Sequence, residues 1–119
     1  MGPDERDAAY IWDMLDSART LHGFMMGVNF YNYTQDKKLQ LAVERALEII
    51  GEAARRVSEA YRQVHSEIPW QNIISQRNVL AHEYGEIKQE LIWKVATIRI
   101  PDLITLLEQL IPVLPEKGI

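Results

Sequence analysis

The stretch that decides the fold is residues 37–57, KKLQLAVERALEIIGEAARRV. Its apolar residues recur at three- and four-residue steps, which is the spacing of one face of an α-helix. Further apolar residues beside them widen this face enough to contact two neighbouring helices. The stretch therefore predicts a long, largely buried helix that begins at Thr34 or Asp36. The apolar face consists of Leu39, Ala42, Val43, Ala46, Leu47, Ile49, Ile50, Ala53, Ala54 and Val57, and continues to Tyr61.

Gly51 lies in the middle of this predicted helix. A glycine there costs about 1 kcal/mol relative to alanine, because it loses more backbone freedom on folding. Its presence suggests the close approach of another helix, and the alternative is a mild local defect.

Helical spacing also recurs on both sides of this stretch. Residues 8–22 form one amphipathic pattern, and residues 27–34 are expected to be a loop rich in aromatic residues. Pro69 marks the start of a helix over about 70–83, with Gly85 as its C-cap. A further helix begins near Lys88 and extends to about Ile111. Pro101 should break it, because proline lacks an amide donor and clashes with the preceding turn.

Strand patterns are missing from the sequence, which carries no β-branched alternation and no Asn-Gly hairpin turn. We therefore expect an all-α, up-and-down bundle of four to five helices, with the last helix broken at Pro101. The length of 119 residues fits a single domain over residues 1–119. A core this small makes pairing with a second copy of the chain a reasonable way to bury more surface.

Composition narrows the function classes. The chain has no cysteine, and no apolar run of membrane-spanning length, so we expect a cytoplasmic protein without disulfides, thiolate metal sites or a membrane partner. The net charge of −4 belongs to residues 1–36, and acids and bases cancel from Lys37 onward. Because no basic stripe exists, any contact with nucleic acid must be local.

The candidate catalytic segment is the octapeptide at residues 77–84, RNVLAHEY. An arginine can hold a phosphate with a planar fork of donors, and a histidine can move a proton near neutral pH. Together they suit phosphodiester chemistry. Arg77 and His82 are five residues apart, about 140° around an ideal helix. They converge only if the helix loosens before Gly85, or if a second copy supplies the complement across a two-fold axis.

Structural readings of the same residues remain open. Arg77 interrupts an apolar row that runs from Trp70 to Tyr84, so it must be paired, reach water or face a subunit boundary. It would pair with Glu48 or Glu52, while His82 would cap the helix end. Glu48 and Glu52 either support Arg77 or form an exposed ion-pair face with nearby arginines. Tyr84 either packs at the end of the row or keeps its hydroxyl in water.

Metal and cofactor sites are not expected. The three histidines, His22, His65 and His82, are scattered without the spacing of paired ligands. Phosphate-cradling glycine loops and nucleophile elbows are absent from the sequence.

Several segments, taken in order, resemble the HepT-like toxin branch of the HEPN superfamily. Residues 77–84 are similar to its Arg-X4-His-X-Tyr motif, and the resemblance extends roughly from the first helix to Leu110. The other matching segments are residues 45–54 with their Gly-Glu-Ala sequence, Ile68-Pro69-Trp70 and Ile100-Pro101-Asp102-Leu103.

The resemblance implies an α-helical homodimer that acts as a metal-independent endoribonuclease, the toxin of a toxin–antitoxin pair. Its partner would be a minimal nucleotidyltransferase antitoxin, and its substrate RNA. The motif tyrosine, Tyr84, would be the acceptor of silencing adenylyl groups. Arg77 would hold the scissile phosphate, His82 would act as general acid or base, and Asn78 would orient His82 or a phosphate oxygen. The alternative function is a non-catalytic helical adaptor that presents a substrate to a nucleotidyltransferase.

Overall fold

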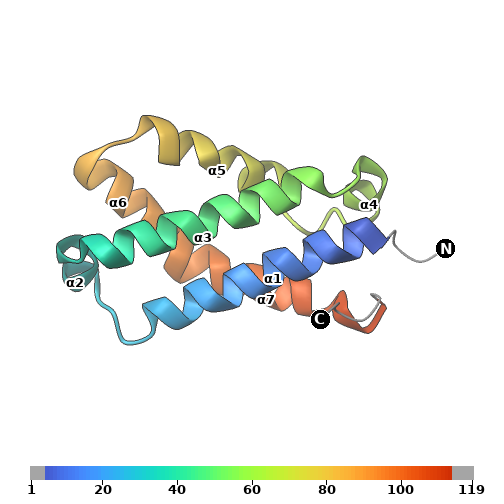
Figure 1. Ribbon diagram of the computed structural model, residues 1–119, viewed down its shortest axis with the longest axis horizontal. Helices are drawn as coiled ribbons and strands as arrows, with labels where there is room; N and C mark the ends of the chain where they lie inside the picture. The colour runs from blue at the N-terminus through green and yellow to red at the C-terminus, as the bar shows by residue number, and fades with distance from the viewer. Residues whose placement is uncertain (1–4, 114–119) are drawn as a thin grey trace.

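The computed structural model describes residues 5–113, which fold as an all-α bundle without strands in that range. Helix α3 lies between α1 and α5, and α7 packs against α1 (Figure 1). The predicted fold class is confirmed. The elements in order are α1 (Glu5–Met25), α2 (Phe30–Gln35), α3 (Lys37–Arg56), α4 (Glu59–Val64), α5 (Trp70–His82), α6 (Gly85–Lys94), a π-helical segment η1 (Val95–Arg99), α7 (Ile100–Glu108) and a 3₁₀ turn η2 (Ile111–Val113).

The core forms around α3, as its apolar pattern predicts. Val43, Leu47 and Ile50 are at most 2% exposed, and they face a matching row on α1 that includes Ile11 and Leu15. Burial of each such side chain contributes roughly 1.5–3 kcal/mol. The N-cap of α3 is Asp36, whose carboxylate accepts a hydrogen bond from the Leu39 amide at 3.0 Å.

Gly51 lies where α5 crosses α3. A Cβ atom on this glycine would lie 3.5 Å from the backbone oxygen of Ile73 on α5, an ordinary contact distance. The close approach of another helix at Gly51 is therefore confirmed. This crossing fixes the separation of α3 and α5 at one end of the groove described below.

Asp7 ties the first turn of α1 to the first turn of α4. Its buried carboxylate accepts hydrogen bonds from the Ser58 amide at 2.8 Å and from the Ser58 hydroxyl at 2.7 Å. The same Ser58 hydroxyl oxygen accepts a hydrogen bond from the Tyr61 amide and so caps α4. Three polar groups at a helix junction are thus satisfied together.

The predicted loop at residues 27–34 is wrong for its second half. After Gly27, which has a φ of 74°, Asn29 caps a short helix, α2, by accepting a hydrogen bond from the Asn32 amide. Two aromatic rings of this helix, Phe30 and Tyr33, lie 5.5 and 5.7 Å from the ring of Trp93 on α6. This tertiary contact stabilises a six-residue helix that would not form alone.

The interruption expected at Pro101 takes the form of the π-helical segment η1, which ends two residues before the proline. The Ile100 amide donates to the Val95 oxygen, five residues back, instead of the α-helical partner. The chain remains helical from Gly85 to Glu108. Helix α6 also starts earlier than the predicted Lys88, at Gly85, whose φ of 61° allows the sharp turn after α5.

Within residues 5–113, no helix is both long enough and apolar enough to cross a bilayer.

Candidate active site

Helix α5 carries the motif and lies on the surface of the bundle. Its first turn is anchored by the buried side chains of Trp70 and Ile73, and the Trp70 indole donates a hydrogen bond to the His65 oxygen at 2.9 Å. Among the described residues of its second half, 75–82, none is buried. Arg77, Asn78 and His82 are exposed on a helix that is fixed at its other end, while Val79 and Leu80 pack against the core.

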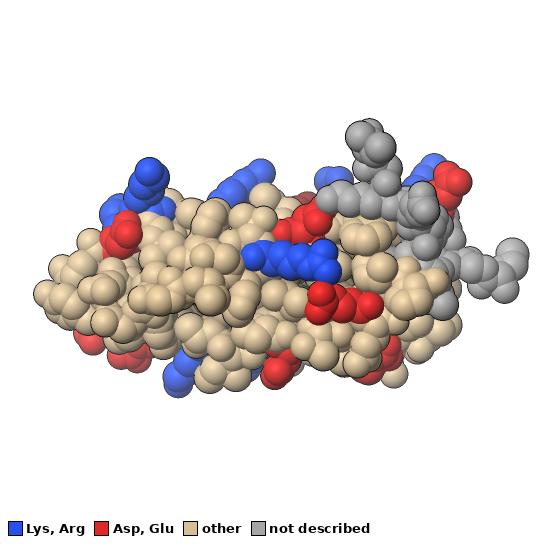
Figure 2. All heavy atoms as spheres, turned by 90° about the horizontal axis from the view of Figure 1, so that it is seen from below, with Lys and Arg blue, Asp and Glu red and all other residues tan. Residues whose placement is uncertain are grey.

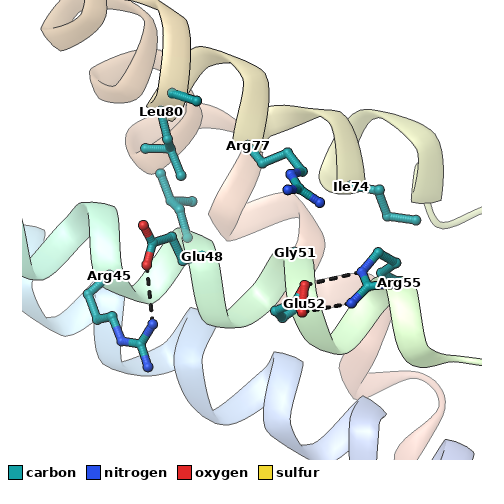
Figure 3. Close-up of a pocket in the computed structure, with 10 residues that line it drawn as sticks. Arg45, Glu48, Gly51, Glu52, Arg55, Ile74, Arg77 and Leu80 are labelled. Carbon is teal, nitrogen blue, oxygen red and sulfur yellow. Dashed lines mark hydrogen bonds and ion pairs between the residues drawn. The ribbon is translucent and has the colours of Figure 1, made fainter.

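A groove of about 310 Å³ separates α5 from α3 (Figure 3). We call it the arginine groove. Arg77 extends into it from α5, between Ile74 and Leu80. The residues that line the groove are Arg45, Leu47, Glu48, Gly51, Glu52, Arg55, Ile74, Arg77, Leu80 and Ala81.

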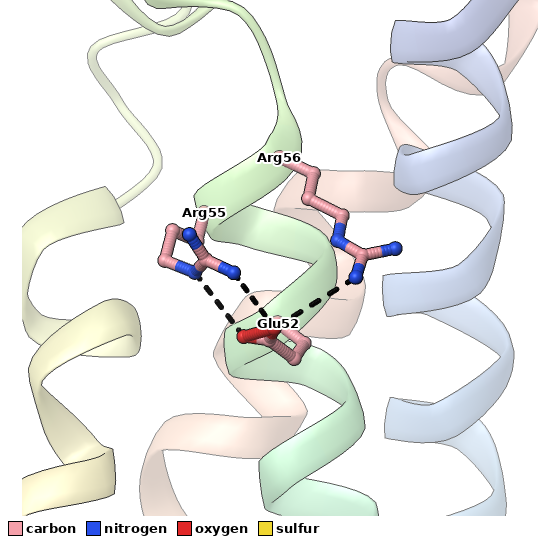
Figure 4. A network of polar contacts seen from close by, with 3 residues as sticks. All are labelled: Glu52, Arg55 and Arg56. Atoms are coloured by element: carbon pink, nitrogen blue, oxygen red, sulfur yellow. Dashed lines mark hydrogen bonds and ion pairs between the residues drawn. The ribbon is translucent and has the colours of Figure 1, made fainter.

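Arg77 makes no hydrogen bond or ion pair with the described residues. Both carboxylates that were candidates to pair with it are held by other arginines. Glu48 pairs with Arg45 at 3.2 Å, and Glu52 accepts two hydrogen bonds from Arg55 at 2.8 and 3.2 Å (Figures 3 and 4). Arg77 therefore forms no direct ion pair with Glu48 or Glu52, although its charge still acts on Glu52. The other reading of these two acids, an exposed ion-pair face with nearby arginines, is confirmed, because each has an arginine partner one turn away on its own helix.

The electrostatics of the arginine groove favour an anion. Hydrogen bonds from Arg55 lower the pKa of Glu52, and the positive charges of Arg55, Arg56 and Arg77 lower it further. Three arginines and two glutamates line the groove, so its net formal charge is +1 in a chain of net charge −4. On the face seen in Figure 2, acidic and basic side chains are instead intermingled.

His82 and Asn78 are exposed and lie outside the arginine groove. His82 is the last residue of α5. The helix does not loosen before this point, since the Glu83 amide still donates to the Val79 oxygen at 3.1 Å. One of the two expected routes by which Arg77 and His82 converge is thus contradicted, and a single chain does not direct both into one groove.

Tyr84 lies in the extended turn between α5 and α6, with φ −137° and ψ 159°. It is 78% exposed, so it does not pack at the end of the α5 row as one reading expected. The reason is that α5 ends at His82 and the chain leaves the helical path before the tyrosine. Tyr84 lines a second groove, formed by α2, the start of α3 and α6.

Sequence reasoning missed this second groove, although it had named the α3 residues that line the first. The available signal is a row of α3 residues at three- and four-residue steps, namely Lys37, Leu41, Glu44, Glu48, Glu52 and Arg55, which line one groove or the other. Glu44 also forms a 2.7 Å ion pair with Lys88 of α6, and both side chains are largely shielded from water.

In the described part of the chain, His, Asp and Glu side chains do not gather in threes or more in a way that could hold a metal ion.

Comparison with known proteins places the chain in a family. The family model described as "Ribonuclease HepT-like" matches residues 14–110. "Probable ribonuclease HepT" of Thermococcus cleftensis is 35% identical over 94 residues, which cover 79% of this chain and 86% of that protein. "Putative RNase MJ1380" of Methanocaldococcus jannaschii is 34% identical over 95 residues, which cover 80% of this chain and 87% of that protein. No solved structure shows a significant match. The chain belongs to the HepT-like ribonuclease family.

Proposed function

We propose that this protein is a metal-independent endoribonuclease whose active site is completed by a second copy of the chain. The observation that carries the proposal is the state of Arg77, which is exposed, lies in a groove of net positive charge and is unpaired within residues 5–113. A guanidinium in that state can receive a phosphate without first breaking an ion pair. The family membership and the names of the relatives support RNA as the substrate.

The chemistry follows from the residue types. A 2′-hydroxyl can attack the adjacent phosphorus once a base removes its proton, and the leaving 5′-oxygen then needs a proton. His82 is placed to exchange protons near neutral pH, and Arg77 to stabilise the charge that develops on the phosphoryl oxygens. Asn78, next to Arg77 on α5, would orient His82 or a phosphate oxygen. Because the nucleophile belongs to the ribose, RNA is cut and DNA is not.

A second copy brings the two side chains together. Arg77 and His82 are about 140° apart around α5, so one substrate contacts both most easily when two α5 helices face each other. The motif half of α5 is exposed and available for such an arrangement. A dimer also supplies two histidines, one as base and one as acid.

The experiment that tests the function is cleavage of single-stranded RNA by the purified, mass-verified protein in the presence of EDTA. We expect cleavage of RNA, with no cleavage of a DNA strand of the same sequence. If the unmodified protein leaves RNA intact, both with EDTA and with added divalent metal, the non-catalytic adaptor replaces the nuclease. Cleavage only on addition of metal would remove metal independence from the proposal.

We further propose that the protein is the toxin of a toxin–antitoxin pair and that a minimal nucleotidyltransferase silences it by adenylylating Tyr84. The support from the structure is accessibility, because Tyr84 is 78% exposed at the end of the motif. An adenylyl group there would add bulk and negative charge close to the motif, and both oppose RNA binding.

Intact-mass analysis after incubation with the partner enzyme and ATP should therefore show addition of adenylyl groups to the wild type, and loss of RNA cleavage. Tyr84→Phe should remain unmodified, while Tyr31→Phe, which removes the hydroxyl of a tyrosine that is 70% exposed, should be modified like the wild type. Modification of Tyr84→Phe would show that the acceptor lies elsewhere.

A further inference from the structure

The second groove is larger than the first and differs from it in character. It has a volume of about 790 Å³ and lies between α2, the first two turns of α3 and α6. We call it the aromatic groove, because Phe30, Tyr31 and Tyr84 line it. Its other lining residues are Thr34, Gln35, Lys37, Gln40, Leu41, Glu44, Gly85, Glu86, Lys88 and Gln89.

The two grooves follow the same face of α3. Lys37, Leu41 and Glu44 line the aromatic groove, and the next residues at the same spacing, Glu48 and Arg55, line the arginine groove. Glu44 and Arg45, one from each groove, are adjacent in the chain. At a rise of about 1.5 Å per residue, the path from Lys37 to Arg55 is about 27 Å long. The two grooves are therefore neighbours along one side of α3.

The charges of the aromatic groove suit a base better than a phosphate. Its two lysines are matched by Glu44 and Glu86, and Lys88 is already neutralised by its 2.7 Å ion pair with Glu44. Tyr31 is 70% exposed, and Phe30 is held in the wall by its edge-on contact with Trp93. Exposed aromatic rings provide faces on which unpaired bases stack, and the positive charge that such sites need for the RNA backbone would come from the arginine groove.

We infer that the aromatic groove is a subsite for the unpaired bases of single-stranded RNA, next to the nucleotide whose phosphate is held at Arg77. This inference rests on the proposed function, whose site it extends. The arginine groove would bind the phosphate, and the aromatic groove beside it on α3 would bind the bases. Because stacking on aromatic rings tolerates any base, the subsite favours single strands over duplex without fixing a sequence.

Tyr31 gives the sharpest test, because most of its ring is exposed and its loss leaves the core unchanged. In a His82→Ala background, which should slow cleavage strongly, binding of a fluorescein-labelled single-stranded RNA is followed by fluorescence anisotropy. Tyr31→Ala should weaken binding about 5- to 150-fold, which corresponds to the loss of one stacking ring. Tyr31→Phe keeps the ring and should bind as before. Phe24→Ala removes another exposed aromatic ring, on α1, and should have no effect.

A second experiment distinguishes base stacking from nonspecific binding of the RNA backbone. An abasic strand of the same length and charge should bind weakly to the parent protein, and Tyr31→Ala should weaken it no further. The inference is overturned if Tyr31→Ala binds the normal RNA like the parent protein. It is also overturned if Tyr31→Ala changes the sedimentation of the protein while leaving RNA affinity intact, because the groove would then be a contact between copies.

The two proposals fail in different ways. Cleavage of RNA by the wild type, without dependence of affinity on Tyr31, removes the base subsite and leaves the nuclease. Binding that depends on Tyr31 and on the bases, without any cleavage, supports the subsite and removes the nuclease.

Discussion

His82→Ala is expected to lower the rate of RNA cleavage by about 10²–10⁴-fold, the usual contribution of a general acid or base. The imidazole is exposed at the last residue of α5, so its removal leaves no cavity and exposes no buried polar group. The cleavage rate with EDTA present is the measurement. Circular dichroism and sedimentation should show an unchanged fold and assembly.

The matched control for this variant is His22→Ala. His22 is also exposed and also lies in the last turn of its helix, α1, so it has a similar surrounding without a proposed role. Its substitution should leave cleavage unchanged. Activity in His82→Ala equal to that of His22→Ala would remove His82 from the mechanism.

Arg77→Ala is expected to lower cleavage by about 10²–10³-fold, comparable to the loss of one preorganised donor to a developing negative charge. Arg77→Lys keeps the positive charge but loses the planar fork of donors, so we expect only partial recovery. Single-turnover rates at saturating RNA measure the effect on the chemical step, and the dependence on RNA concentration measures the effect on binding.

Arg19→Ala is a suitable control, because Arg19 is an exposed arginine whose partner, Glu108 at 2.8 Å, is far along the chain on α7. It changes the net charge of the protein by the same amount as Arg77→Ala. If the two variants lose activity equally, the effect of Arg77 is one of overall charge and not of phosphate contact.

The parts of the fold that the sequence predicts are those set by local periodicity. The stripe on α3 and the start of α5 after Pro69 were predictable, since apolar spacing and proline position act within a few residues. Helix α2 was not, because it depends on the contact of Phe30 and Tyr33 with Trp93, some sixty positions away. The π-helical form of the interruption before Pro101 likewise depends on how α6 and α7 both pack into the bundle.

The candidate site, too, was predictable only in the part that depends on neighbouring residues of the sequence. The sequence identified Arg77 and His82 as a pair of side chains suited to phosphate chemistry and predicted their separation around the helix. One of its readings, an exposed ion-pair face of Glu48 and Glu52 with nearby arginines, is what the structure shows. The sequence did not decide between this reading and support of Arg77 by the same acids, because that choice depends on side-chain conformation. The grooves were also hidden, since each combines α3 with segments that are distant in the sequence.

The shallow burial of the second half of α5 has an evolutionary consequence. Its exposed residues, among them Arg77, Asn78 and His82, contribute little to the folding free energy of a single chain, whereas Val79 and Leu80 pack against the core. Substitutions at the exposed positions are surface changes, which usually alter stability by less than about 0.5 kcal/mol. Selection can therefore adjust this surface to what it binds without first compensating for a weakened core, while Trp70 and Ile73 keep the helix in place.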